Sequence, residues 1–444
     1  MEILEEESVR IASNIDDRVT ERVCGFKTLH NVNVVPVKDE LTMKSRVIAL
    51  AVGIAFALAG CRSTVDRIEA VNLHEIASPA AVDSGQPNLA VGPGGEMYLS
   101  WMETTEEGSS VLKFAQRTGD GWSPARTIVQ DYELLVNYAD FPSLLAIGKN
   151  LLAAHWMSFV PESEGYNVNI ALSSNGGETW SKPVVPHRDG TPTEHGFVSM
   201  VPDPSGGVAA IWFDSRKLSG GSVSDDVAMM VARIELDGTA GPETVIDDRV
   251  CECCQTSAIA VPGGILAAYR DRSNEEIRDI AIVEFDGRQW SKPRIVFADN
   301  WEISACPING PALAAQGRNV AVAWFTAVND EPKVQAVIST DGGDSFGQPF
   351  QIDDGKALGR VDVAMLDSGG ALVSWLEQTD QGAEVRARAI QPDGSVQPSI
   401  VVGATGAGTS SGFPRMKRDA GTIVFAWTDS NQVRVRTAVL DLKN

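Results

Sequence analysis

The chain has 444 residues, a formal net charge of −22 and 43% hydrophobic residues. This acidity argues against a phosphate-backbone partner, because affinity for nucleic acid rests on Lys and Arg neutralising phosphates. We therefore expect no nucleic-acid partner, and the excess negative charge favours solubility.

The first 68 residues predict an export signal rather than a folded domain. Residues 1–42 are acidic and lack strand or helix periodicity, so we interpret them as a disordered or misassigned leader, with Met43 as the initiator. Met43, Lys44 and Arg46 then begin a signal peptide over residues 43–60. Its apolar run, from 47 to 58, is too short to be a spanning helix.

The residues Leu58-Ala59-Gly60-Cys61 resemble the lipobox of bacterial lipoproteins. The resemblance implies cleavage before Cys61, lipidation of its thiol, and a tether over residues 61–68. In such lipoproteins, an Asp directly after the lipidated Cys keeps the protein in the inner membrane. Arg62 follows Cys61 here, so the resemblance implies that the protein is sorted to the outer membrane. We therefore expect a lipid-anchored protein that faces the periplasm or the cell surface.

After the tether the chain repeats a run of small or β-branched apolar residues that ends in an aromatic residue. The aromatic recurs about every 50–57 residues, which is the period of a four-stranded propeller blade. The seven copies end at Trp101, Trp156, Trp212, Tyr269, Trp324, Trp375 and Trp427. We therefore predict an all-β fold, a seven-bladed β-propeller over residues 69–444, with six blades as the alternative.

Each repeat reads as four short strands bounded by Gly, Asp, Asn and Pro. The seventh repeat stops after its third strand, which ends at Val439. We expect the segment 70–76 to supply the missing outer strand. The N-terminal strand would then close the propeller and leave no sheet edge exposed.

Two turns carry a second signature: Ser173–Trp180 reads SSNGGETW and Ser339–Phe346 reads STDGGDSF. Both resemble the Asp-box of sialidase-type (BNR) propellers. The local physics is clear, because Asp or Asn bonds the turn amides, Gly takes a positive φ, and the aromatic fills the gap to the next sheet. The signature therefore indicates fold rather than catalysis, and in that family it lies on the face opposite the active site.

Four cysteines remain after the leader and the lipidation site: Cys251, Cys253, Cys254 and Cys306. The first three precede the inner strand of the fourth repeat and Cys306 precedes that of the fifth, so we expect their loops to be neighbours. In an oxidising periplasm, a disulfide from the first loop to Cys306 would tie two blades together. The alternative is a copper or zinc site formed by the four cysteines and His195.

The resemblance to sialidases runs from about Ser84 to the C-terminus. It implies an axial pocket in which arginines hold a sugar carboxylate, an Asp is the acid/base, and a Tyr activated by a Glu is the nucleophile. Loops and strand ends on the same face offer Arg216, Arg270, Arg360 and Arg415 as substrate-binding residues, and Asp140, Tyr138, Asp214 and Asp271 as catalytic residues.

The chain departs from that family in two respects: an Arg-Ile-Pro motif near the first blade is absent, and true sialidases have six blades. A structural alternative also stays open for these residues. Asp214 with Arg216, and Arg270 with Asp271, could form ion pairs at strand ends, and Tyr138 could simply pack.

The sequence therefore predicts an outer-membrane-anchored, sialidase-like propeller that binds a glycan at its axial face. Whether it is an enzyme stays open; if it is one, the resemblance implies a glycoside hydrolase of exo-sialidase type. The alternative function is a metal-binding or redox propeller centred on Cys251, Cys253, Cys254 and Cys306. We expect a monomer whose other partner is the membrane, through the N-terminal lipid.

Overall fold

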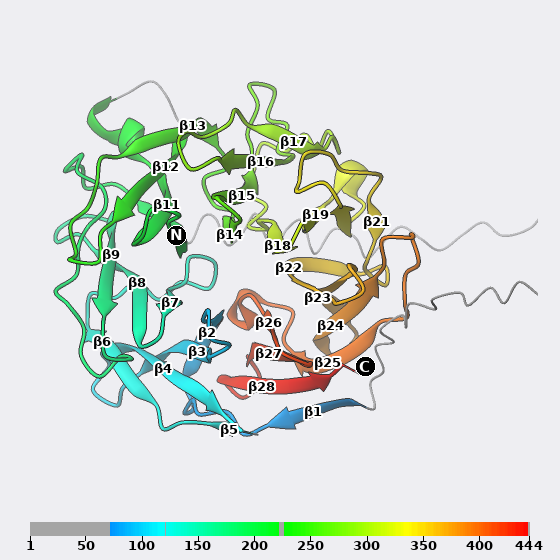
Figure 1. Cartoon of the computed structure of the whole chain (residues 1–444), viewed down its shortest axis with the longest axis horizontal. Coiled ribbons are helices and arrows are strands. Elements are labelled where there is room, and N and C mark those ends of the chain that lie inside the picture. The colour runs from blue at the N-terminus through cyan, green and yellow to red at the C-terminus, as the bar shows by residue number, and fades with distance from the viewer. Residues whose placement is uncertain (1–71, 120, 222–225, 443–444) are drawn as a thin grey trace, which may run out of the picture. The chain divides into compact units, whose positions relative to one another are not determined.

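The computed structural model describes residues 72–119, 121–221 and 226–442. These residues form seven antiparallel β-sheets and three short 3-10 helices (Figure 1). The helices are η2 (Arg216–Gly221), η3 (Val328–Asp330) and η4 (Thr409–Ser411).

In the first six sheets the innermost strand comes first along the chain, and the seventh sheet takes its outermost strand from the N-terminal side. The first sheet has β2 (Ser84–Val91), β3 (Met97–Thr104), β4 (Ser110–Thr118), β5 (Gly121–Trp122) and β6 (Arg126–Asp131). The second has β7 (Ser143–Gly148), β8 (Leu151–Phe159) and β9 (Tyr166–Ser173). The third has β10 (His195–Pro202), β11 (Val208–Asp214), β12 (Val227–Ile234) and β13 (Thr244–Val250).

The remaining sheets repeat this order. The fourth has β14 (Ser257–Val261), β15 (Gly264–Arg270), β16 (Ile280–Phe285) and β17 (Arg294–Phe297). The fifth has β18 (Ala312–Gln316), β19 (Asn319–Thr326), β20 (Lys333–Ser339) and β21 (Phe350–Gln351). The sixth has β22 (Ala357–Met365), β23 (Ala371–Thr379), β24 (Gly382–Ile390) and β25 (Ile400–Thr405). The seventh has β26 (Arg415–Asp419), β27 (Thr422–Asp429), β28 (Arg434–Asp441) and β1 (Leu73–Ile76).

The innermost strands contact one another in a closed cycle, from β2 through β7, β10, β14, β18, β22 and β26 back to β2. Apolar clusters fill the spaces between neighbouring sheets. The prediction of a seven-bladed all-β propeller is therefore confirmed, and the six-bladed alternative is wrong.

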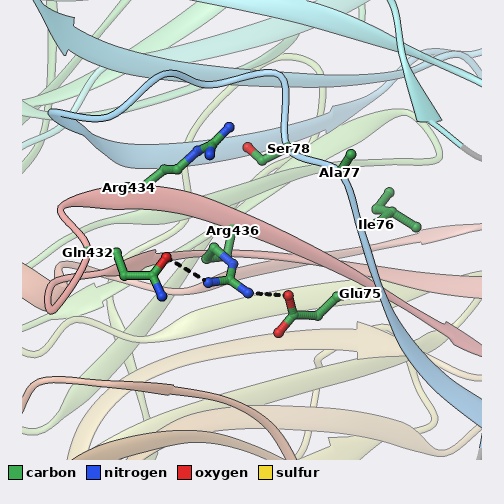
Figure 2. A pocket seen from close by; sticks show the side chains of 7 residues that line it. All are labelled: Glu75, Ile76, Ala77, Ser78, Gln432, Arg434 and Arg436. Atoms are coloured by element: carbon green, nitrogen blue, oxygen red, sulfur yellow. Dashed lines mark hydrogen bonds and ion pairs between the residues drawn. The ribbon is translucent and has the colours of Figure 1, made fainter.

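The closure predicted at the termini is also confirmed. Strand β1 pairs antiparallel with β28, with Leu73 opposite Leu440 and Ile76 opposite Thr437. Figure 2 shows the junction, a shallow hollow in which the guanidinium of Arg436 lies between Gln432 and Glu75. The N-terminal strand thus covers an edge that the last sheet would otherwise expose.

The recurring aromatic residue explains how the second strand of several sheets is held. The indole N–H of Trp101 donates to Glu103 (2.6 Å), that of Trp212 to Asp214 (2.9 Å), and that of Trp375 to Glu377 (2.6 Å). The ring is buried in the core, and the carboxylate two residues later satisfies its only polar atom.

The turn signature has the geometry that its residues predict. Asn175 Oδ1 accepts the N–H of Thr179 (3.0 Å), and Gly177 has a φ of 85°. The ring of Trp180 packs edge-on against Phe114 of the first sheet, with 6.1 Å between ring centroids. A Cβ on Gly177 would lie 2.3 Å from that phenyl ring, so the turn needs glycine for space as well as for φ.

The leader 1–42, the signal peptide 43–60, the tether 61–68 and Cys61 lie outside the described residues, so their assignments stay predictions. Within the described part of the chain, no helix has the length and apolar character needed to cross a membrane.

Candidate functional site

The segments that precede the innermost strands, which we call the axial loops, are joined to one another by side chains. The amide of Gln255 donates to the carbonyl of Ala139 (2.7 Å) and accepts the N–H of Gly310 (3.1 Å). One buried glutamine thus connects the axial loops of the second, fourth and fifth sheets. Only its place next to the cysteines marks this residue in the sequence.

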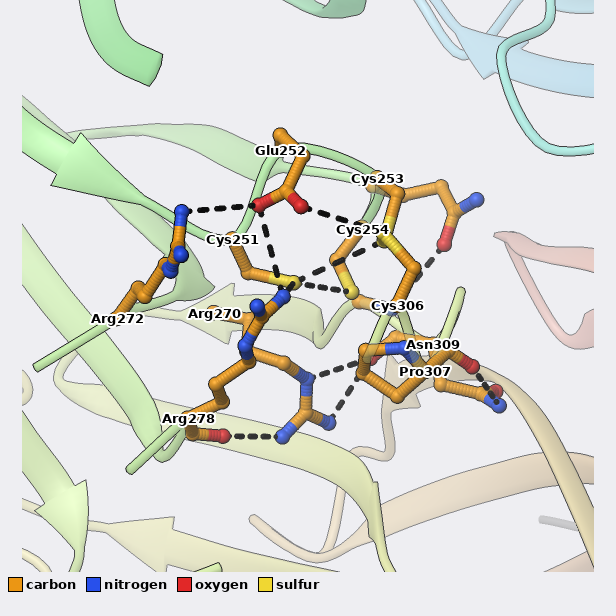
Figure 3. Close-up of a disulfide and its surroundings, with 12 residues drawn as sticks. Cys251, Glu252, Cys253, Cys254, Arg270, Arg272, Arg278, Cys306, Pro307 and Asn309 are labelled. Carbon is orange, nitrogen blue, oxygen red and sulfur yellow. Dashed lines mark hydrogen bonds and ion pairs between the residues drawn. A yellow bond between two sulfur atoms is a disulfide. The ribbon is translucent and has the colours of Figure 1, made fainter. Parts of the chain in front are cut away.

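Two of the four cysteines form a disulfide that links neighbouring axial loops. Cys253 is bonded to Cys306 across 53 residues, with 6.0 Å between their Cα atoms (Figure 3). The predicted proximity of the loops is confirmed, and the disulfide alternative is the one observed. The predicted metal set is not assembled in this state, because two of its thiols are bonded to each other and His195 belongs to a different cluster.

The other two cysteines are buried below the disulfide. Cys251 Sγ lies 3.1 Å from Cys254 Sγ and 3.9 Å from Cys253 Sγ. Burial raises the pKa of Cys251, but a hydrogen bond from Cys254 and the charges of Arg278 and Arg270 outweigh it and lower the pKa to about 7. Burial and the neighbouring sulfur raise the pKa of Cys254 well above its usual value. Cys251 is therefore the more acidic thiol of the pair.

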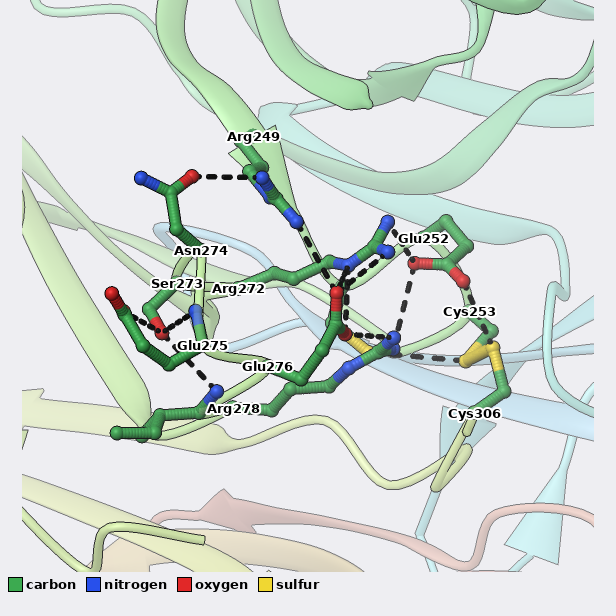
Figure 4. A network of polar contacts seen from close by, with 12 residues as sticks. Arg249, Glu252, Cys253, Arg272, Ser273, Asn274, Glu275, Glu276, Arg278 and Cys306 are labelled. Carbon is green, nitrogen blue, oxygen red and sulfur yellow. Dashed lines mark hydrogen bonds and ion pairs between the residues drawn. A yellow bond between two sulfur atoms is a disulfide. The ribbon is translucent and has the colours of Figure 1, made fainter. Parts of the chain in front are cut away.

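A network of charged side chains lies beside the disulfide (Figure 4) and contacts Cys251 through Arg278. Arg278 Nη1 donates to Cys251 Sγ (3.3 Å), and Nη2 of the same residue donates to Glu276 (3.0 Å). Glu276 also pairs with Arg272 (2.9 Å) and with Arg249 (3.2 Å). This network fixes the Arg278 guanidinium against the sulfur.

Arg270 lies deeper and is fully buried. Its guanidinium donates to the carbonyl oxygens of Arg278 (2.6 Å), Asn309 (2.9 and 3.0 Å) and Phe325 (2.7 Å). These contacts link the fourth sheet to the fifth, and they favour a structural role for Arg270 over ligand binding. The partners differ from those expected, because Arg270 bonds backbone carbonyls and not the carboxylate of Asp271. Asp271 itself is partly buried, and burial with the nearby Asp247 raises its pKa to about 6.

A second cluster, which the sequence identified only in part, lies at the start of the third sheet. His187 Nδ1 and His195 Nε2 lie 3.4 and 3.2 Å from Asp189 Oδ1. The two imidazole rings are stacked, with 3.7 Å between centroids. His187 and Asp189 were missed, because only the folded axial loop brings them to His195.

Asp214 and Arg216 border this cluster and form the ion pair that the structural alternative predicted. Arg216 donates to both Asp214 oxygens (2.6 Å each) and to Glu243 (2.6 Å). Burial raises the pKa of Asp214, but Arg216 and Trp212 outweigh it and the net pKa is lowered. Asp214 is thus held as an anion, and its predicted catalytic role stays a prediction.

Asp140 is a buried carboxyl group in the axial loop of the second sheet. Its Oδ1 accepts the N–H of Phe197 (2.8 Å). Burial raises the pKa of Asp140 to about 7, although the Phe197 N–H and the Tyr166 hydroxyl both act to lower it. Asp140 Oδ2 itself has no partner in hydrogen-bond geometry among the described residues. The sequence did not indicate Tyr166, whose phenol the fold places near this buried carboxyl group.

Arg360 and Arg415 come from the neighbouring inner strands β22 and β26 and lie against aromatic rings. The guanidinium carbon of Arg360 lies 5.8 Å from the ring centroid of Tyr138 and 5.9 Å from that of Phe413. Arg415 lies 4.4 Å from the ring centre of Phe141. The structure thus places the predicted Arg360 beside the predicted Tyr138, and Arg415 of the adjacent strand beside Phe141.

The backbone of β22 aims Arg360 by means of a β-bulge. The pairing register with β23 shifts between Gly359 and Asp362, and Arg360 has a φ of 55°. Its N–H donates to Asn309 Oδ1 (2.7 Å), and a Cβ on Gly359 would lie 2.2 Å from that oxygen. Bulges and left-handed non-glycine residues of this kind concentrate at functional sites.

No known family profile matches the chain, and no curated protein matches its sequence. Among solved structures, it is similar to a Dyadobacter fermentans protein of unknown function, with 15% identity over 84% of this chain and 100% of that one and a TM-score of 0.45. It is also similar to the NanB sialidase of Streptococcus pneumoniae, with 9% identity over 85% and 98% of the two chains and a TM-score of 0.44.

A third similar structure is the α-L-arabinanase of Penicillium chrysogenum in complex with arabinobiose, with 11% identity over 83% and 97% of the two chains and a TM-score of 0.46. At these values the assignment of the fold rests on the strand pairing described above.

Proposed function

We propose that the protein binds an acidic glycan at its axial face, through Arg360 and Arg415. The observation that carries this proposal is that neither guanidinium forms an ion pair with a carboxylate among the described residues. Burying a cation is costly unless an anion accompanies it. A ligand carboxylate would supply the missing charge.

The partners of Arg360 are all neutral. Its Nη1 donates to Ser411 Oγ (2.6 Å) and to the carbonyls of Gly408 (3.0 Å) and Gly412 (3.2 Å). Burial lowers the pKa of Arg360 to about 10. The cation is thus destabilised in the free protein, and pairing with a planar carboxylate would relieve this.

Arg415 is still less satisfied. Within the described part of the chain its side chain forms no hydrogen bond, and its Nε is buried without a partner. Burial lowers its pKa, which the charge of Asp362 offsets only in part. Both Asp362 oxygens are already engaged, by the N–H groups of Val363 (2.9 Å) and Met416 (2.8 Å).

The aromatic rings beside the arginines suit a sugar. Tyr138, Phe141 and Phe413 present ring faces next to the two guanidinium groups. Binding sites for organic ligands combine such apolar faces with a few directed polar groups. An acidic sugar offers both, a carboxylate for the arginines and C–H faces for the rings.

We propose binding rather than hydrolysis. A phenol attacks only when a base accepts its proton. Burial raises the pKa of Tyr138, and among the described residues no carboxylate is hydrogen-bonded to it. The axial residues therefore support recognition of a carboxylate more strongly than they support a tyrosine nucleophile.

We also propose that lipidation at Cys61 anchors the propeller to the outer membrane. The sequence Leu58-Ala59-Gly60-Cys61 supports this. A glycan-binding domain held at a membrane would retain acidic polysaccharides or glycoproteins near the cell.

Isothermal titration of the soluble form, starting at residue 62, tests the proposal. We expect binding of sialyllactose and no binding of lactose, because only the former carries a carboxylate. Arg360→Met and Arg415→Met should each weaken binding by about 10- to 100-fold, the loss expected for one hydrogen bond to a charged group.

Arg318→Met is the matched control, since Arg318 bonds the carbonyl of Asp341 in the turn signature, away from the axial loops. It should leave binding unchanged. Equal affinity for lactose and sialyllactose, or full affinity in both axial variants, would contradict the proposal.

A further inference from the structure

The four cysteines form two pairs that differ in exposure. Cys306 is exposed and bonded to Cys253, whereas Cys251 and Cys254 are buried and reduced. The buried pair has the spacing Cys-x-x-Cys, which is typical of dithiols that exchange with disulfides. The sequence interpretation missed this spacing because Cys253 interrupts it.

Cys251 is the sulfur that contacts both pairs. Its Sγ is 3.1 Å from Cys254 Sγ on one side and 3.9 Å from the Cys253 sulfur of the disulfide on the other (Figure 3). Thiol–disulfide exchange requires a thiolate in contact with a disulfide sulfur. Cys251 Sγ occupies that position, 3.9 Å from the Cys253 sulfur.

The charge around Cys251 suits a nucleophilic thiolate. Arg278 Nη1 donates to its sulfur (3.3 Å) and lies 3.5 Å from Glu252, while Nη2 of the same residue pairs with Glu276 at 3.0 Å (Figure 3). A cation next to a sulfur is the usual feature that makes a cysteine reactive. The lowered pKa of Cys251 agrees with this geometry.

We propose that these cysteines form a two-electron relay, which passes reducing equivalents between the buried Cys251/Cys254 pair and the surface pair Cys253/Cys306. In the first step the Cys251 thiolate attacks Cys253 Sγ. A Cys251–Cys253 bond forms, the Cys253–Cys306 bond breaks, and Cys306 leaves as a thiolate that takes a proton from solvent.

In the second step Cys254 loses its proton and attacks Cys251 Sγ. The Cys251–Cys254 bond forms, and Cys253 leaves and takes up a proton. Overall the buried dithiol is oxidised to a disulfide and the surface disulfide is reduced to a dithiol, so atoms and electrons balance within the chain.

The surface pair connects the relay to other molecules. Cys306 is exposed, and as a thiol it has the Glu252 carboxylate 3.6 Å away as an acceptor. The reduced surface pair would reduce a disulfide of a protein or small molecule, and a dithiol partner would return the two electrons. The cysteine pairs form a site separate from Arg360 and Arg415, so the relay does not depend on glycan binding.

Tryptic mapping can follow the relay, because the two disulfides give different peptides. Cys251, Cys253 and Cys254 all lie in the peptide 250–270, and Cys306 lies in 295–318. The Cys253–Cys306 bond cross-links these peptides, whereas the Cys251–Cys254 bond leaves them separate with Cys253 and Cys306 free for alkylation.

The experiment uses the full chain with Cys24→Ser and Cys61→Ser, so that only four thiols remain. Reduced protein receives one equivalent of oxidised glutathione, is quenched with acid and is alkylated. We expect both disulfide isomers, in a ratio that does not depend on protein concentration. Cys251→Ser should give only the cross-linked peptides, and Cys254→Ser should accumulate the Cys251–Cys253 intermediate.

Arg278→Gln keeps all four cysteines and tests the relay without removing a sulfur. We expect it to fold and to exchange about tenfold more slowly, because the thiolate loses its cation. The relay is overturned if the cross-linked peptides account for all the disulfide at all times in the parent protein. Stoichiometric zinc on the reduced protein, with no exchange, would also overturn it and assign the cysteines to a metal.

Discussion

Asp140→Asn should remove a pH dependence of stability that the buried carboxyl group creates. The pKa of Asp140 is raised from 3.8 to about 7 by burial. Between these values the folded protein keeps the proton while the unfolded chain loses it. The stabilising contribution of the protonated group is therefore complete below pH 3.8 and is lost as the pH rises through about 7.

The size of the effect follows from the shift. Each pKa unit corresponds to about 1.4 kcal/mol, so ionisation of Asp140 lowers the free energy of unfolding by at most about 4 kcal/mol between pH 4 and 7. Asn keeps an oxygen to accept the N–H of Phe197, which lies 2.8 Å from Oδ1, but it carries no charge. The variant should therefore match the parent near pH 4 and exceed it in stability at pH 7.

Urea unfolding followed by tryptophan fluorescence, from pH 4 to 8, measures this difference. Asp271→Asn is the control, because its pKa is raised only to about 6 and it should remove a smaller part of the slope. Parallel pH profiles for parent and Asp140→Asn would refute the reasoning, as would a variant less stable than the parent at pH 7.

Three further outcomes follow from the structure. Arg415→Met should weaken acidic-glycan binding and yet raise the melting temperature by about 2 °C, because an apolar chain over Phe141 replaces a cation that has no ion-pair partner among the described residues. A lower melting temperature in calorimetry would show that the cation is stabilising. Gly310→Ala should lower the free energy of unfolding by about 3 kcal/mol or prevent soluble expression, because a Cβ would lie 1.9 Å from the carbonyl oxygen of Gln255. The control is Gly347→Ala, where a Cβ would have no atom of the described residues within 4 Å, and it should be neutral in the same denaturation assay. Cys61→Ser should release the protein from membrane fractions and abolish incorporation of labelled palmitate, and labelling that persisted would show that the motif was misread.

The fold could be predicted because its signals are local and repeated. The aromatic residue in the second strand recurs in every repeat, and the incomplete seventh repeat pointed to the strand that became β1. The proximity of Cys253 and Cys306 also followed from topology, since both residues precede innermost strands of adjacent sheets.

The candidate site could be predicted only in part, because loop conformation and side-chain direction depend on tertiary contacts. Nothing in the sequence showed that the Arg270 guanidinium would donate its hydrogen bonds to three backbone carbonyls, or that His187 would stack on His195. The bulge that turns Arg360 toward Tyr138 depends on Asn309 in the preceding axial loop, which no local pattern reveals.

The central claim is that Arg360 and Arg415 recognise a carboxylate. The most direct test compares the affinity of a sialic acid methyl glycoside with that of its C1 methyl ester, a ligand of nearly the same shape without the charge. We expect the acid to bind at least about tenfold more tightly than the ester, and Arg360→Met and Arg415→Met to remove this difference. Equal affinity of the parent protein for acid and ester would contradict it.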